Sequence, residues 1–289
     1  MIFSEFLAKK RVVLFDGAIG TELARLGLET SGGINLTNPE HIVNFHRRYA
    51  RLGVDVLTTN TFTLNRISVE SHGLTLDLHA ANLSGVRLAK EAINEGQFVF
   101  GDIGPTGRLL EPYGNYTEQQ FFDNFREQAL VLAEGGVDGF IIETMTDLRE
   151  AICALKACRD ATELPVIVTL AFSTTAKGGR TVMGSSVSET TAALEAHGAD
   201  AVGANCGELS PEEMAIIAAM YKEFSTLPVL IQPNAGKPKL VGRSTVYDMK
   251  PEEFADGIKK CIDSGASIVG GCCGTTLEHI RAVVQMVRQ

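Results

Sequence analysis

The stretch GGVDGFIIET, residues 135–144, joins the end of a predicted helix to a predicted strand. Glycine is the residue expected where a helix ends, because it accepts the left-handed conformation found there. The run that follows, Gly139-Phe140-Ile141-Ile142, contains no polar residue and is typical of a parallel strand covered on both faces. Polar Glu143 and Thr144 come directly after it. The stretch therefore predicts an α/β architecture with its polar groups at the strand end.

The same pattern recurs along the chain. LGVD at residues 52–55, HGAD at 197–200 and SGAS at 264–267 each end a predicted helix and open a predicted strand. The recurrences are unevenly spaced, so they mark βα units rather than a solenoid repeat.

Eight βα units follow from the apolar runs that Gly, Pro or Asp bound. The predicted strands cover residues 12–15, 54–59, 98–102, 139–143, 165–171, 201–205, 228–232 and 267–270. The predicted helices cover residues 39–52, 76–94, 118–134, 147–159, 188–197, 211–224, 251–264 and 276–287. Strict alternation of eight units predicts a (β/α)₈ TIM barrel. We expect a single domain over residues 1–289, with a doubly wound open sheet as the alternative.

Composition restricts the class of protein. The 289 residues are 45% hydrophobic and 21% charged, as in globular proteins with a large core. The net charge of −9 argues against nucleic-acid partners, which need clustered Lys and Arg. No apolar run approaches membrane-spanning length, and residues 1–11 lack the features of a signal peptide. A cytoplasmic protein without a membrane partner is expected, with its six cysteines as thiols, metal ligands or catalytic groups.

In a (β/α)₈ barrel the active site lies at the carboxyl ends of the strands. The residues at these positions are largely polar, ionisable or thiol-bearing. In chain order they are Asp16-Gly17, Asn60-Thr61, Asp102 with residues 104–107, Glu143-Thr144, Ser173-Thr174, Asn205-Cys206, Pro233-Asn234 and Cys272-Cys273.

Three cysteines belong to this set. Cys206 follows the sixth predicted strand, and Cys272 and Cys273 follow the eighth, so the three can meet across one intervening strand. Three thiolates with an open fourth position resemble a catalytic zinc site. The competing interpretation is that they are small buried apolar residues, since a Cys-Cys pair lacks zinc-ribbon spacing. Their common strand-end placement favours metal. The remaining cysteines lie in helical patterns and are assigned to packing.

The segment Gly270-Gly271-Cys272-Cys273-Gly274-Thr275-Thr276, with Asn205-Cys206, resembles the zinc-binding signature of the homocysteine S-methyltransferase family. Residues 15–21, 59–62, 101–107 and 143–144 are similar to further family segments, in the family's order. Residues 274–276 and 232–236 are most similar to the homocysteine-binding barrel of cobalamin-dependent methionine synthase. Leu277 departs from that group, which often carries proline there.

The resemblance implies roles for individual residues. Zn²⁺ would be held by the three cysteines, and homocysteine sulfur would complete the tetrahedron. Asn234 would supply an oxygen ligand until substrate displaces it, or a hydrogen bond to a ligand. Glu143 would pair with the substrate α-ammonium, and Asp16 with the Gly17 and Ala18 N–H groups would bind the amino-acid head. Asn60 is a further substrate-binding candidate. An interior ion pair for Glu143 and a simple turn for Asp16 are the alternatives.

The implied reaction is attack of a metal-activated thiolate on a methyl group, giving methionine. The expected donor is methylcobalamin on a partner corrinoid-binding protein or domain, since a full barrel leaves no room for one in this chain. S-methylmethionine or a betaine is the alternative donor. A non-catalytic zinc or redox sensor is the alternative of another class. A phosphate-binding aldolase or lyase is a further enzyme alternative, but cysteines follow the eighth predicted strand where its phosphate loop would lie.

Overall fold

Eight parallel strands form a closed barrel in the computed structural model, which describes residues 3–242 and 244–288. Their order is β1-β12-β9-β8-β5-β4-β3-β2. A parallel bridge between Phe15 and Val56 joins the two ends of this order, and Asp55 N donates to Leu14 O at 2.7 Å. The predicted (β/α)₈ fold is confirmed, and the open-sheet alternative fails because the edges meet. The barrel strands are β1 (Val13–Leu14), β2 (Val56–Thr58), β3 (Phe98–Ile103), β4 (Gly139–Met145), β5 (Val166–Leu170), β8 (Ala201–Asn205), β9 (Val229–Gln232) and β12 (Ile268–Val269).

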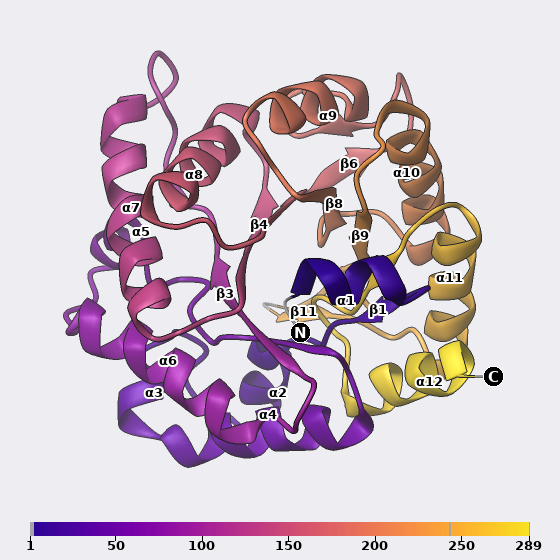
Figure 1. Cartoon of the computed structure of the whole chain (residues 1–289), viewed down its shortest axis with the longest axis horizontal. Coiled ribbons are helices and arrows are strands. Elements are labelled where there is room, and N and C mark those ends of the chain that lie inside the picture. Colours follow the sequence, from indigo (N-terminus) through magenta and orange to yellow (C-terminus); the bar gives the residue numbers. More distant parts are fainter. Residues whose placement is uncertain (1–2, 243, 289) are drawn as a thin grey trace.

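A ring of helices surrounds the barrel (Figure 1). Each predicted helix is present, with bounds within two residues of those expected. They are α4 (Pro39–Leu52), α6 (Leu78–Ala92), α7 (Glu118–Glu134), α8 (Leu148–Ala161), α9 (Val187–Ala196), α10 (Pro211–Phe224), α11 (Pro251–Asp263) and α12 (Leu277–Arg288). Proline begins α4, α10 and α11, where its missing N–H costs nothing. No helix in the described part of the chain is both long and apolar enough to cross a membrane.

Several short elements were not predicted. The loops contain three short helices, α2 (Ile19–Arg25), α3 (Ile34–Thr37) and α5 (Arg66–Ser71). They also contain two hairpins, one of β6 (Phe172–Thr174) with β7 (Arg180–Thr181) and one of β10 (Lys239–Val241) with β11 (Ser244–Val246). The helix α1 (Phe3–Lys9) crosses the middle of the barrel in Figure 1. Its Phe3 ring meets Phe98 and Phe100 edge-on, with centroids 5.4 and 4.6 Å apart, and closes the amino-terminal end.

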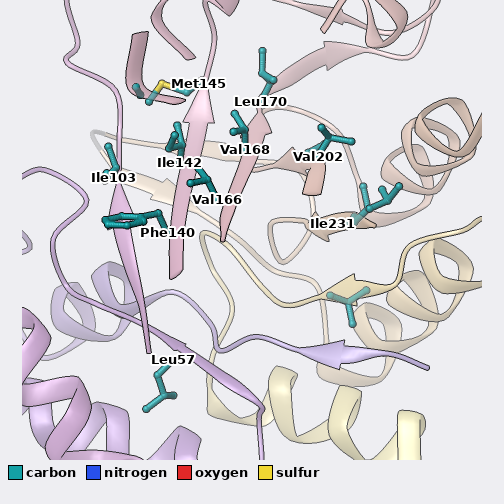
Figure 2. Packing of buried hydrophobic residues seen from close by; sticks show 14 of the residues in the cluster. Leu57, Ile103, Phe140, Ile142, Met145, Val166, Val168, Leu170, Val202 and Ile231 are labelled. Atoms are coloured by element: carbon teal, nitrogen blue, oxygen red, sulfur yellow. The ribbon is translucent and has the colours of Figure 1, made fainter. Parts of the chain in front are cut away.

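Apolar side chains fill both faces of the strands. Ile142, Val168 and Val202 lie on neighbouring strands and belong to the large cluster between the barrel and its helices (Figure 2). The alternate residues Ile141 and Ile167 belong to a second cluster inside the barrel, to which Phe3 contributes. Continuous burial of both faces explains why these strands lack a hydrophobic–polar alternation.

Polar side chains replace the apolar ones at the next inward positions toward the carboxyl ends of the strands. Glu143 follows Ile141 on β4, Thr169 follows Ile167 on β5, and Asn205 and Gln232 end β8 and β9. Thr169, Asn205 and Gln232 are buried. The barrel thus carries an apolar floor and a polar layer on which the candidate site is built.

Candidate metal centre

The three strand-end cysteines form one cluster. Their Sγ atoms lie within 4.8 Å of one another, and the Cys206 and Cys273 sulfurs are 3.8 Å apart. Within residues 3–242 and 244–288, no other set of three His, Cys, Asp or Glu side chains lies close enough to share an ion. The remaining cysteines, Cys153, Cys158 and Cys261, are buried in α8 and α11, which confirms their assignment to packing.

Backbone conformation at Cys206 turns its side chain into the cluster. Cys206 has a left-handed φ of 56°, which is uncommon for a residue with a side chain. Its N–H donates to Gln232 O at 3.1 Å, holding it against β9. Gly207 follows with a φ of 74°, and a Cβ there would lie 2.6 Å from the Phe172 carbonyl oxygen. A strained residue held by its neighbours is typical of functional sites.

Hydrogen bonds fix the loop that carries the vicinal cysteines. Cys272 N donates to Pro233 O at 2.9 Å, and the Cys273 carbonyl accepts from Ala235 N at 2.9 Å. The Thr275 hydroxyl donates to Cys272 O at 2.7 Å. The loop after β12 is therefore tied to the loop after β9, which brings Cys272 and Cys273 to a defined position beside Cys206.

The chemistry of the cluster fits a tetrahedral metal. Two sulfurs bound to zinc at about 2.3 Å with a tetrahedral angle stand about 3.8 Å apart, and Cys206 and Cys273 show this separation. Hydrogen bonds from the Cys206 and Cys272 thiols lower the pKa of Cys273. Hydrogen bonds with Cys206 and Cys273 raise the pKa of Cys272, because they hold its proton. The cluster readily holds one negative charge, and a dication would remove the remaining protons.

Asn234 presents an oxygen that lacks a partner in the described structure. The side chain is fully buried, and its Nδ2 donates to the Gly207 carbonyl at 2.9 Å. Its Oδ1 receives no hydrogen bond. A buried acceptor left without a donor costs about 1–3 kcal/mol. The predicted ligand role would give this oxygen a partner, and that role stays a prediction.

Asn205 connects the cluster to Glu143. Its Nδ2 donates to Glu143 Oε2 at 3.0 Å and lies 3.7 Å from Cys272 Sγ. Its Oδ1 accepts from Thr144 N and Thr169 Oγ1, both at 2.7 Å. Burial, then the nearby Cys273 and Asp16 charges, raise the pKa of Glu143 to about 8. Sequence reasoning did not assign Asn205 a role, although its position directly before Cys206 at a strand end was a usable signal.

The residues after β1 lie at the same carboxyl-terminal end of the barrel as the cysteine cluster. The Asp16 carboxylate accepts from Thr58 N and Thr58 Oγ1, both at 3.0 Å. Burial raises the pKa of Asp16 to about 7. Ala18 N–H donates to Thr275 Oγ1 at 3.2 Å, so this predicted substrate donor already has a partner in the structure. A Cβ on Gly17 would lie 3.0 Å from Thr275 Oγ1, so only glycine fits comfortably.

Two further residues make contacts that the sequence did not predict. The Asn60 amide donates to Asn35 Oδ1 at 2.9 Å, and its place in a substrate site stays a prediction. Tyr247, which follows β11, packs so closely over Gly274 that no Cβ would fit there. No local pattern could have identified Tyr247, because it reaches the cluster only through the fold of the long loop after β9.

The chain is similar to known proteins both in sequence and in fold. Residues 13–287 match the family described as Homocysteine S-methyltransferase. The chain is 32% identical to methionine synthase of Mycobacterium leprae and 31% identical to that of Mycobacterium tuberculosis, over 96% of its own length. It spans about a quarter of these relatives, 24% and 25%. Its fold matches the metallated form of the homocysteine methyltransferase MmuM from Escherichia coli, with a TM-score of 0.80, 22% identity and coverage of 97% and 98% of the two chains.

Proposed function

The chain belongs to the homocysteine S-methyltransferase family, and on this premise we propose that it is a zinc-dependent enzyme that methylates homocysteine to methionine. The observation that carries the proposal is the three-cysteine cluster, in which the Cys206 and Cys273 sulfurs are 3.8 Å apart, together with the unpartnered oxygen of Asn234. We further propose that the protein acts in the cytoplasm.

Cys206, Cys272 and Cys273 would hold the metal, with Asn234 Oδ1 in the fourth position before substrate arrives. Zinc bound in this way would accept the homocysteine sulfur and keep it deprotonated at neutral pH. The rigid attachment of the three cysteines to β8 and β12 fixes where that sulfur lies. The protein's contribution at this point is orientation of the nucleophile.

Glu143 and Asp16 would bind the head of the substrate. Glu143 stands on β4 beside the cluster, joined to it through Asn205. Both carboxyls have raised pKa values because they are buried, so a cationic ammonium would favour their charged forms. Gly17 leaves room for the substrate to approach the main chain after β1. In this arrangement one end of the substrate is fixed by charge and the other by sulfur.

The bond changes are simple. The sulfur of homocysteine attacks the methyl carbon, a carbon–sulfur bond forms, and the bond from the methyl group to its donor breaks with its electron pair staying on the donor. No proton transfer to a histidine is required. The donor we propose is methylcobalamin on a corrinoid-binding protein or domain, because the chain is similar to about a quarter of the length of two much longer methionine synthases.

A donor screen tests this function. Zinc-loaded protein and homocysteine are mixed with methylcobalamin, a methylated corrinoid protein, S-methylmethionine or betaine, and methionine is measured. We expect the fastest methionine formation with the corrinoid protein. Cys272→Ser should lose both zinc and methionine formation while the barrel stays folded, whereas Cys261→Ser, a buried cysteine of α11, should lose neither.

The other outcomes of these assays decide between the alternative donors, the sensor role and the proposed mechanism. Faster turnover with S-methylmethionine or betaine would replace the corrinoid donor and leave the acceptor site intact. Bound zinc with no homocysteine-dependent turnover from any donor would instead support the alternative of a zinc or redox sensor. Full activity of Cys272→Ser would exclude the proposed mechanism.

A further inference from the structure

Strand β4 contains a bulge at its carboxyl end. Ile142 pairs with Val168 of β5, and the next pair is Met145 with Leu170. Three steps along β4 therefore match two along β5, which places one extra residue at positions 143 and 144. Bulges of this kind re-aim side chains and are common next to active sites.

The bulge places two successive side chains of β4 on one side of the strand. In a regular strand successive side chains point to opposite faces, and residues two apart share a face. The Asn205 amide nevertheless donates to both Glu143 Oε2 at 3.0 Å and Thr144 Oγ1 at 2.7 Å. Met145, which would share the inward face of Glu143 in a regular strand, is instead buried in the cluster between the barrel and its helices. The bulge thus keeps Glu143 inward while the next residues return to the core.

Thr144 adopts a backbone conformation that threonine disfavours. Its φ of 61° is left-handed, an outlier for a β-branched residue and a conformation that glycine would adopt without strain. Asn205 holds this conformation from two sides: Oδ1 accepts from Thr144 N, and Nδ2 donates to Thr144 Oγ1, both at 2.7 Å. The Thr144 side chain is only partly buried, so packing of the core does not explain why threonine stands here.

The hydroxyl of Thr144 supplies a contact that glycine would lack. Asn205 Nδ2 has two hydrogens, and Thr144 Oγ1 and Glu143 Oε2 are its two short acceptors. Its third neighbour, Cys272 Sγ, is 3.7 Å away. Without the hydroxyl, Asn205 and residue 144 would share one hydrogen bond in place of two, and glycine would let the backbone adopt other conformations. The position of Glu143 would then be loosely defined.

We propose that Thr144 is a positioning residue of the acceptor site. Its left-handed backbone and its hydroxyl, both held by Asn205, fix the carboxylate of Glu143 relative to the cysteine cluster. The strain belongs to the site, since it is kept at a position where glycine would fold at least as well. The inference rests on the proposed function, which gives Glu143 its contact with the substrate, and it assigns Thr144 no such contact of its own.

Two substitutions separate this role from a role in folding. Thr144→Gly removes both the strain and the hydroxyl, whereas Thr144→Ser keeps the hydroxyl. Homocysteine affinity of the zinc-loaded protein is measured by calorimetry without a methyl donor, and stability by urea denaturation. We expect Thr144→Gly to weaken homocysteine at least about tenfold, because a small misplacement of a positioned group has effects of this size. Its urea midpoint should stay at the wild-type value, because relief of strain offsets the freedom that glycine adds to the unfolded chain. Thr144→Ser should bind homocysteine as the wild type does.

A double-mutant cycle tests whether Thr144 acts through Glu143. In a Glu143→Gln background, Thr144→Gly should change homocysteine affinity less than about twofold, because the carboxylate that it positions is already absent. Lys177→Gly is the matched control for strain. Lys177 also has a left-handed φ, 53°, but it lies exposed in the loop between β6 and β7. Lys177→Gly should keep the wild-type homocysteine affinity, and both glycine variants should keep the wild-type zinc affinity.

Wild-type homocysteine affinity in Thr144→Gly would overturn the proposal, as would an equal loss with and without the Glu143 carboxylate. A urea midpoint that falls together with the affinity, or a loss of zinc, would show that Thr144 supports the fold or the cysteine cluster and would also overturn it. Failure of the proposed function is distinguishable. Absent methyl transfer from every donor would contradict the proposed reaction, while homocysteine binding that still depends on Thr144 would support the positioning role.

Discussion

Replacement of Asn205 by alanine should destabilise the barrel at its polar layer. Asn205 is fully buried, and its Oδ1 is the acceptor for Thr144 N and Thr169 Oγ1, each at 2.7 Å. Without that oxygen the part-buried Thr144 N loses its acceptor, and the buried Thr169 Oγ1 keeps only a long contact of 3.5 Å to Ile142 O. A buried group that loses its partner costs about 1–3 kcal/mol, so we expect Asn205→Ala to lower the free energy of unfolding by roughly 2–4 kcal/mol.

Asn205→Asp distinguishes the role of the side-chain oxygen from that of the amide nitrogen. It keeps the oxygen that Thr144 and Thr169 need, but it puts a second carboxyl 3.0 Å from Glu143 Oε2 in place of the amide donor. Urea denaturation at pH 6, followed by circular dichroism, should therefore place Asn205→Asp between the wild type and Asn205→Ala. Measurements with saturating zinc and with a chelator separate this loss from any loss of metal.

Two results would refute this reasoning. A loss below about 1 kcal/mol for Asn205→Ala would mean that the donors find other acceptors. Equal losses for the alanine and aspartate variants would mean that the oxygen of Asn205 is not what stabilises this layer.

Three further outcomes are expected. Gly207→Ala should lower the free energy of unfolding by about 2 kcal/mol or more and weaken zinc binding, because of its φ of 74° and the Phe172 oxygen 2.6 Å from the new Cβ; unchanged zinc affinity would contradict it. Asn234→Ala should keep zinc and tighten homocysteine, measured by calorimetry, if substrate normally displaces the Asn234 oxygen; no tightening would favour the hydrogen-bond role. Burial raises the pKa of Glu150 from 4.5 to about 7, so its stabilisation is full below about pH 4.5 and lost above about pH 7. Glu150→Gln should therefore gain roughly 3 kcal/mol relative to wild type between pH 4.5 and pH 8 in denaturant titrations, and a pH-independent difference would contradict this.

The alternation of strands and helices could be predicted because local chemistry determines it. Gly53 and Gly136, both left-handed in the structure, lie where predicted helices give way to predicted strands. Uninterrupted apolar runs such as residues 139–142 are buried on both faces, as the absence of polar residues indicated. Strand-end position then identified the three cysteines, since a barrel brings all its carboxyl ends to one rim.

Long-range contacts account for what the sequence did not reveal. Phe3 closes the barrel floor by packing on β3, yet nothing in residues 3–9 indicates that partner. The left-handed φ of Cys206 and the Asn205 contacts depend on neighbouring strands. The unpartnered oxygen of Asp102 becomes visible only when the residues around it are placed. Local sequence determines the order of strands and helices, while the charges and hydrogen bonds at the carboxyl ends of the strands depend on residues far apart in the chain.

The central claim is that Cys206, Cys272 and Cys273 hold zinc and leave one position for a substrate sulfur. X-ray absorption at the zinc edge counts the sulfur neighbours of the metal directly. The account predicts three sulfurs and one oxygen or nitrogen neighbour in the protein alone, and four sulfurs after homocysteine is added. An unchanged sulfur count on adding homocysteine, or fewer than three sulfurs before it, would contradict the account.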